Sequence, residues 1–169
     1  MPFERMERME TFDLEARVQQ AVDLFNSGHN CAQSVFMAYA DLFGVDAETA
    51  SKMSVSFGGG MGRMREVCGT VSGMAMLAGF HYPVPDPSDA KARTRNYAMV
   101  QQMATLFKEQ FGTIICRELL APQDAAKTNP TPDARTQAYY FKRPCGRFVA
   151  AAARIAGEML QGKLVPQEK

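Results

Sequence analysis

Apolar residues recur along this chain at intervals of three and four, and each run stops at a glycine or a proline. The first run begins at Leu14 and reaches Phe25, with Gly28 just beyond it. This spacing is that of one face of an α-helix, whereas no segment shows the strict alternation typical of a half-buried strand. We therefore expect an all-α fold, a compact helical bundle of about six helices.

Side chains able to cap a helix precede several of the other apolar runs. The clearest is Asn30, because Gln33 follows three residues later in a variant of the capping box. Residues 122–136, PQDAAKTNPTPDART, indicate an exposed connection that is longer than most in compact domains. The remaining helices are expected to begin at Asp46, near Val67, at Ser88, at Thr113 and at Pro144.

The length of 169 residues suits one domain built around a single core. Hydrophobic residues make up 46% of the chain and charged residues 22%, which are the proportions of an ordinary globular protein. We expect a single helical domain over residues 1–169, in which residues 1–12 form a loosely ordered amino-terminal segment.

Charge and hydropathy argue against two classes of partner. The 19 Lys and Arg residues nearly balance the 18 Asp and Glu residues, and no basic stripe is available for a phosphate backbone, so nucleic acid is not expected. No stretch approaches the roughly 20 apolar residues of a membrane span, and the first residues do not resemble a signal peptide. We expect a cytoplasmic protein that does not bind a membrane.

The chain has four cysteines, and each falls in the first turn of a different predicted helix. In a reducing compartment, cysteines serve in catalysis, transient redox chemistry or metal binding more often than in permanent disulfides. A helix amino terminus stabilises negative charge through its unpaired N–H groups, so it favours the reactive thiolate. No two of them have the CxxC spacing of zinc ribbons and thioredoxin-like proteins. The candidate catalytic residues are therefore Cys31, Cys68, Cys116 and Cys145.

A glycine-rich loop precedes the second cysteine. Residues 58–73 read GGGMGRMREVCGTVSG, with six glycines in sixteen positions. Glycine permits positive φ and close approach, so this loop would let backbone amides or a substrate reach the sulfur of Cys68. A phosphate-binding loop is not indicated, because the GK[ST] ending is missing. Arginines near the cysteines would stabilise thiolates if they point inward, and these are Arg63, Arg65, Arg117, Arg143 and Arg147.

The four cysteines lie in longer sequence blocks, namely GHNCAQSVF around Cys31, FGGGMGRMREVCGTVSGMAMLAGF around Cys68, FGTIICRELL around Cys116 and RPCGRFV around Cys145. In these blocks the chain resembles the C_GCAxxG_C_C family of redox-active proteins, which is named for its cysteine pattern. The family label reads Gly-Cys-Ala, whereas here Cys68 precedes Gly69 and threonine stands in place of alanine. The resemblance implies redox activity through cysteines and brings no substrate with it.

Three hypotheses follow for the function. The first is a cytosolic thiol redox protein that works by dithiol–disulfide exchange or by electron transfer. In the exchange reaction Cys31 and Cys68 are the expected pair, one attacking and one resolving. Thiol exchange requires no cofactor, and the sequence does not identify the redox partner. The second is a zinc site or an iron–sulfur cluster, for which the four cysteines are the alternative ligands. The third is a helical binding module without enzymatic activity, whose cysteines only pack. The sequence leaves the oligomeric state open.

Overall fold

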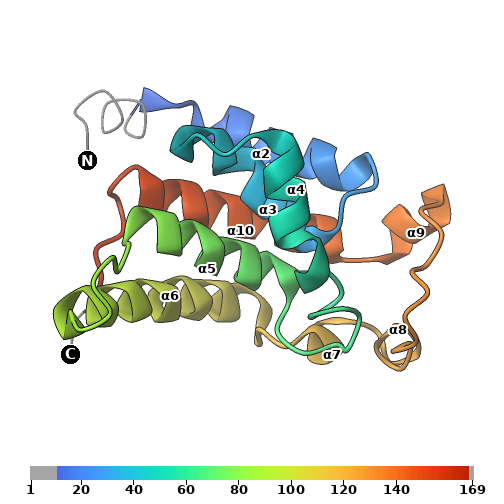
Figure 1. Cartoon of the computed structure of the whole chain (residues 1–169). Coiled ribbons are helices and arrows are strands. Elements are labelled where there is room, and N and C mark those ends of the chain that lie inside the picture. Colours follow the sequence, from blue (N-terminus) through green and yellow to red (C-terminus); the bar gives the residue numbers. More distant parts are fainter. Residues whose placement is uncertain (1–10, 168–169) are drawn as a thin grey trace.

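A computed structural model describes residues 11–167 and has nine α-helices in that part of the chain (Figure 1). The only β pairing within this range is an isolated antiparallel bridge between Val67 and Ile115. The all-α prediction is confirmed, and the larger helix number reflects three short helices. The helices are α2 (Leu14–Asn26), α3 (Cys31–Ala40), α4 (Ala47–Ser54), α5 (Gly69–His81), α6 (Ala90–Phe111), α7 (Cys116–Leu119), α8 (Pro122–Ala125), α9 (Gln137–Lys142) and α10 (Cys145–Leu160), with 3₁₀ turns η1 (Asp41–Phe43) and η2 (Val55–Phe57).

Helix α10 lies in the middle of the bundle. It packs against α2 on one side and α5 on the other, and α6 lies beyond α5 (Figure 1). Helix α3 crosses this layer and contacts α2, α5 and α10. The hydroxyl of the fully buried Tyr39 in α3 donates a hydrogen bond of 2.7 Å to the carbonyl of Ala153 in α10. The core between these helices is continuous and includes Phe36, Met74, Leu77, Met103, Phe107 and Val149.

Several predicted helix starts are correct at the level of the capping side chain. Asn30 caps α3 in a complete capping box with Gln33, and the Asp46 carboxylate accepts from the Thr49 N–H at the start of α4. Both carry an oxygen that replaces the missing partner of a first-turn N–H group. The α2 helix and its end before Gly28 also agree with the prediction.

Other predicted starts are wrong by a few residues. Asp89, rather than Ser88, caps α6, because the Ser88 hydroxyl and N–H both bond to the Asp86 carboxylate. Thr113 lies before α7 and accepts from the Ile115 N–H in a turn, so that helix begins later.

The remaining differences concern residues next to cysteines and the amino terminus. Helix α5 begins at Gly69, and Pro144 occupies the capping position of α10, so that helix begins one residue later at Cys145. The expected loose segment over residues 1–12 lies, except for its last two residues, outside the described part of the chain.

The predicted exposed connection over residues 122–136 holds the short helix α8 and then crosses one end of the bundle. Helices α7, α8 and α9 gather at this end, near the glycine-rich loop that leads into α5 (Figure 1). Within residues 11–167, no helix is both long enough and apolar enough to cross a membrane.

Candidate functional site

All four cysteines line one cavity of about 60 Å³. Three of them are the first residue of a helix, namely Cys31 of α3, Cys116 of α7 and Cys145 of α10, and Cys68 is the residue just before α5. Four helix starts therefore converge on one point, each bringing a sulfur atom. All four are free thiols. The structure thus brings together every cysteine that the sequence singled out.

Cys31 and Cys68 form a hydrogen-bonded pair in which the two thiols have opposite proton affinities. The Cys68 thiol donates to the Cys31 sulfur, and the N–H groups of Gly59, Ala32 and Cys31 itself also point at that sulfur. These donors outweigh the effect of burial and lower the pKa of Cys31 to about 6. Donating to Cys31 raises the pKa of Cys68 well above its usual range, and burial adds to this effect.

Gly69 allows the two cysteines to meet. A Cβ atom at this position would lie 2.6 Å from the Cys31 Sγ and 2.8 Å from the Phe57 carbonyl oxygen. The order of Cys68 and Gly69, which departs from the family label, therefore has a structural consequence. Cys68 takes the capping position, and the glycine that follows gives the Cys31 sulfur room beside the start of α5.

The glycine-rich loop forms a left-handed turn over the cavity. Its five consecutive residues from Gly59 to Arg63 all have φ between 55° and 68°, and Arg65 has φ of 63°. Three of these six residues are not glycine, and such residues are uncommon in this region and concentrate at functional sites. The turn directs the Gly59 N–H at the Cys31 sulfur. The predicted role of the loop was to serve Cys68, whereas this amide serves Cys31.

Backbone pairing holds Cys68 and Cys116 next to each other. The Cys68 N–H donates to the Ile114 carbonyl at 2.8 Å, and the Cys116 N–H donates to the Glu66 carbonyl at 2.7 Å, on either side of the Val67–Ile115 bridge. The loop also passes very close to Cys116, since a Cβ atom on Gly60 would lie 2.7 Å from the Cys116 Cβ.

Burial keeps the last two thiols protonated. It raises the pKa of Cys116, and the negative charge of Cys31 adds to this effect. The same two causes raise the pKa of Cys145 to about 12. The cavity therefore holds one thiolate and three neutral thiols at neutral pH, although all four lie at helix starts. Helix position alone does not decide which sulfur ionises.

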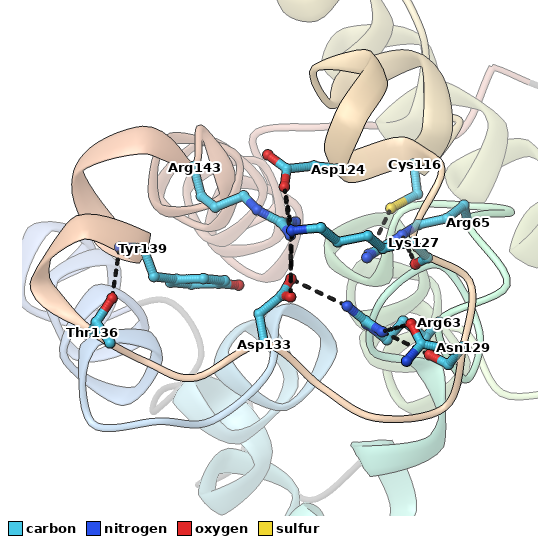
Figure 2. A network of polar contacts seen from close by, with 10 residues as sticks. All are labelled: Arg63, Arg65, Cys116, Asp124, Lys127, Asn129, Asp133, Thr136, Tyr139 and Arg143. Atoms are coloured by element: carbon cyan, nitrogen blue, oxygen red, sulfur yellow. Dashed lines mark hydrogen bonds and ion pairs between the residues drawn. The ribbon is translucent and has the colours of Figure 1, made fainter.

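Arg65 is the arginine that meets a cysteine. It is only 4% exposed, and its Nη1 lies 4.0 Å from the Cys116 Sγ, while its Nε donates to the Lys127 carbonyl (Figure 2). Within residues 11–167, its buried Nη2 atom has no hydrogen-bond partner. No carboxylate of that range forms an ion pair with it either. Among the arginines that the sequence marked, Arg143 also lines the cavity, whereas Arg117 pairs with Glu66 outside it.

Two acidic residues of the 122–136 connection neutralise the neighbouring arginines. Asp133 pairs with Arg143 at 2.5 Å and with Arg63 at 3.2 Å, and Asp124 pairs with Arg143 at 3.3 Å (Figure 2). Burial raises the pKa of Asp133, but the hydrogen bond from Arg63 and the surrounding positive charges outweigh it, so the pKa is lowered. These ion pairs fasten the connection across the cysteine end of the bundle.

Sequence reasoning missed two residues of this site, Arg135 and Tyr139. The Arg135 guanidinium donates to the Phe25 and His29 carbonyls and lies 4.8 Å from the centre of the Tyr139 ring. Both residues line the cavity, but neither lies near a cysteine in a motif that could have identified it. A second, more open groove of about 470 Å³ adjoins the cavity between the glycine-rich loop and the connection.

Within the described residues, no group of three or more His, Cys, Asp or Glu side chains is arranged to hold a metal ion. Although the four thiols share a cavity, their arrangement therefore gives the hypothesis of a zinc or iron–sulfur site no geometric support.

A family model described as "Putative redox-active protein (C_GCAxxG_C_C)" matches residues 29–159, which include all four cysteines. Comparison with curated proteins and with solved structures finds no match.

Proposed function

Because the chain belongs to the C_GCAxxG_C_C redox-active family, we propose that it is a thiol–disulfide redox protein whose active pair is Cys31 and Cys68. The observation that carries the proposal is that these two thiols line one cavity and are hydrogen-bonded, which lowers the pKa of Cys31 and raises that of Cys68. A nucleophile needs the thiolate form, and a resolving thiol must lie next to it. The cytoplasm, as a reducing compartment, would keep the pair in the dithiol form between turnovers.

The proposed reaction has two steps. The Cys31 thiolate attacks one sulfur of a substrate disulfide, so a mixed disulfide forms and the other half of the substrate leaves as a thiolate. Cys68 then gives up its proton and attacks the Cys31 sulfur, which releases the second half of the substrate as a thiol. The protein ends with a Cys31–Cys68 disulfide, and the substrate has gained two electrons.

The hydrogen bond explains the division of roles between the two cysteines. It keeps the proton on Cys68 while Cys31 is a thiolate, so only one of them is nucleophilic at first. Once Cys31 is in a mixed disulfide it no longer carries the charge that raises the pKa of Cys68. Cys68 then ionises more readily, and resolution follows attack. Cys116 and Cys145 complete the wall of the cavity as neutral thiols.

The pH dependence of alkylation tests this proposal. We expect iodoacetamide to modify Cys31 of the reduced protein at a rate that rises with pH around a midpoint of about 6, because only the thiolate reacts. Cys68→Ala removes a donor to that sulfur and should move the midpoint upward, toward ~8.5. Mass spectrometry of tryptic peptides identifies the modified residue. A wild-type midpoint above ~8 would contradict the proposal.

The pairing itself is tested by oxidation. One equivalent of a disulfide oxidant should produce a Cys31–Cys68 bridge, which peptide mapping distinguishes from the other pairings that four cysteines allow. A dominant bridge between Cys116 and Cys145, with Cys31 left as a free thiol, would assign the redox pair elsewhere.

A further inference from the structure

The cavity between the cysteines carries an excess of positive charge. No acidic residue within residues 11–167 lines it, although three arginines do. Arg143 is neutralised by Asp124 and Asp133, and the Arg135 guanidinium is engaged by the Phe25 and His29 carbonyls. Arg65 is only 4% exposed, and in the described part of the chain its Nη2 atom has no hydrogen-bond acceptor.

A buried guanidinium without a counter-ion is costly, since such groups are normally paired with an anion. The thiol next to Arg65 is that of Cys116. Burial raises the pKa of this thiol, so it stays protonated and does not supply the missing negative charge. The Cys31 thiolate lies in the same cavity and contributes a single negative charge. The electrostatics of the cavity therefore favour an additional anion beside Arg65.

The volume of the cavity limits what that anion can be. About 60 Å³ has room for a few water-sized groups and therefore for a molecule with a handful of non-hydrogen atoms. A folded protein or a bulky peptide disulfide does not fit inside and would have to approach through the outer groove of about 470 Å³. A small ligand, in contrast, can enter and reach both Arg65 and the sulfurs.

From these observations we infer that the cavity binds a small anion carrying an electrophilic sulfur atom, with Arg65 as its charge partner and Cys31 as the nucleophile. The inference rests on the proposed function and names its substrate class. The unpaired charge of Arg65 favours an anion, the cavity volume limits the size of that anion, and the adjacent dithiol requires that it carry an electrophilic sulfur.

Thiosulfate is a suitable probe, and its reaction can be written in full. The Cys31 thiolate attacks the outer sulfur, the sulfur–sulfur bond of thiosulfate breaks, and sulfite leaves with the bonding electrons. Cys31 is then a persulfide anion. Cys68 gives up its proton and attacks the Cys31 Sγ, and the outer sulfur leaves as hydrosulfide with that proton. Two thiols have been oxidised to a disulfide, and the outer sulfur has been reduced by two electrons.

The experiment compares this anion with a neutral disulfide of comparable size, dimethyl disulfide. Reduced wild-type protein should release one sulfite and one hydrosulfide per Cys31–Cys68 disulfide formed. Arg65→Met keeps an unbranched side chain at a position of positive φ but removes the charge. It should slow the thiosulfate reaction at least about tenfold and the neutral reaction less than about threefold, since a charge-assisted hydrogen bond acts on the anion alone. Arg65→Lys should recover part of the loss.

Arg117→Met is the matched control. The Arg117 side chain lies next to Arg65 and donates to its carbonyl at 3.3 Å, but it is half exposed and paired with Glu66. Both reactions should keep their wild-type rates in that variant. Equal slowing of the two reactions by Arg65→Met would overturn the inference, because Arg65 would then have a structural role. If wild-type protein reduces the neutral disulfide but not thiosulfate, the inference fails and the proposed function stands. If it reduces neither, the proposed function fails.

A second measurement does not depend on the folding of an Arg65 variant. The doubly substituted Cys31→Ser, Cys68→Ser protein lacks both sulfurs of the reactive pair, so calorimetry on it reports thiosulfate binding without reaction at that pair and with Arg65 unchanged. Saturable binding with one site per chain, displaced by sulfite, is the expected result. Absence of binding at millimolar thiosulfate would overturn the inference.

Discussion

At the sulfur of Cys31, a set of short contacts replaces the water that would solvate a thiolate. The Cys68 thiol and three backbone N–H groups donate to it, and together they lower its pKa to about 6 in spite of burial. Gly69 makes this possible by leaving space at the start of α5. One missing side chain thus allows the contact on which the proposed chemistry depends.

Gly69→Ala tests this steric requirement. The added methyl group would lie 2.6 Å from the Cys31 Sγ and 2.8 Å from the Phe57 carbonyl oxygen, so either the sulfur or the backbone must move. We expect the free energy of unfolding to fall by about 1–3 kcal/mol, as in other overpacked interiors. The alkylation midpoint of Cys31 should rise, because its donors are displaced. Urea unfolding and the pH profile of alkylation measure the two effects.

Gly79→Ala is the matched control for that experiment. Gly79 lies in the same helix, is exposed, and has no atom within 4 Å of an added Cβ. Alanine should stabilise the helix by up to ~1 kcal/mol and leave Cys31 unchanged. Unaltered stability and alkylation in Gly69→Ala would show that the close approach has no consequence.

At the scale of elements, the glycine-rich loop and the 122–136 connection enclose the cysteine end of the bundle. The loop is held by its left-handed turn and by the pairing of Val67 with Ile115. The connection has little regular structure, and charge holds it in place. Asp133 binds Arg63 and Arg143, whose side chains are only 10% and 6% exposed.

Asp133→Asn should loosen this connection. It removes the negative charge shared by two nearly buried arginines, and we expect the free energy of unfolding at pH 7 to fall by about 2 kcal/mol. Amide hydrogen exchange should become faster over residues 127–135 before it does so in α10. Glu48→Gln, which breaks the exposed pair of Glu48 with Lys52, is the control and should cost less than ~0.5 kcal/mol.

The pH dependence of the Asp133 effect has a definite sign. The pKa of this carboxyl is lowered in the folded protein, so its contribution to stability is fully present above the unfolded value of about 3.9 and is lost as the pH falls through the folded value. Wild-type protein and the Asp133→Asn variant should therefore differ at pH 7 and converge in acid. A difference that persists unchanged in strong acid would show that charge is not its cause.

At the scale of the whole molecule, the bundle directs four helix starts to one end. The reactive pair lies at the starts of helices α3 and α5, which pack directly against each other. A disulfide between Cys31 and Cys68 would close the chain between these two helices, including α4 and the glycine-rich loop. Redox state and global stability should therefore be coupled.

Oxidation is expected to stabilise the fold. In the chain-entropy treatment, a cross-link between residues 31 and 68 lowers the entropy of the unfolded chain by an amount worth about 4 kcal/mol, which is an upper value because strain subtracts from it. Thermal unfolding of the oxidised and reduced forms measures the difference. The doubly substituted Cys31→Ser, Cys68→Ser protein should show no response to the oxidant. A lower midpoint for the oxidised form would indicate that the bridge distorts the cavity.

The sequence by itself determined the helical class, most helix limits and the special position of the four cysteines, because these depend on neighbours within one or two turns. Asn30 shows this well, since its cap and the Gln33 that completes it are three residues apart. The starts at Ser88 and Thr113 were misplaced because nearby residues competed for the same polar groups, with Asp86 taking the Ser88 hydroxyl.

Only the tertiary structure decided which cysteine ionises and what surrounds it. The Cys31 sulfur receives hydrogen bonds from Cys68 and from Gly59, both distant in sequence, and Arg135 reaches the cavity from near the end of the 122–136 connection. Hydrogen bonds and burial act through space over a few ångströms, so a pattern along the chain cannot encode their balance. The convergence of the helix starts and the unpaired charge of Arg65 also depend on contacts between segments that are far apart in the sequence.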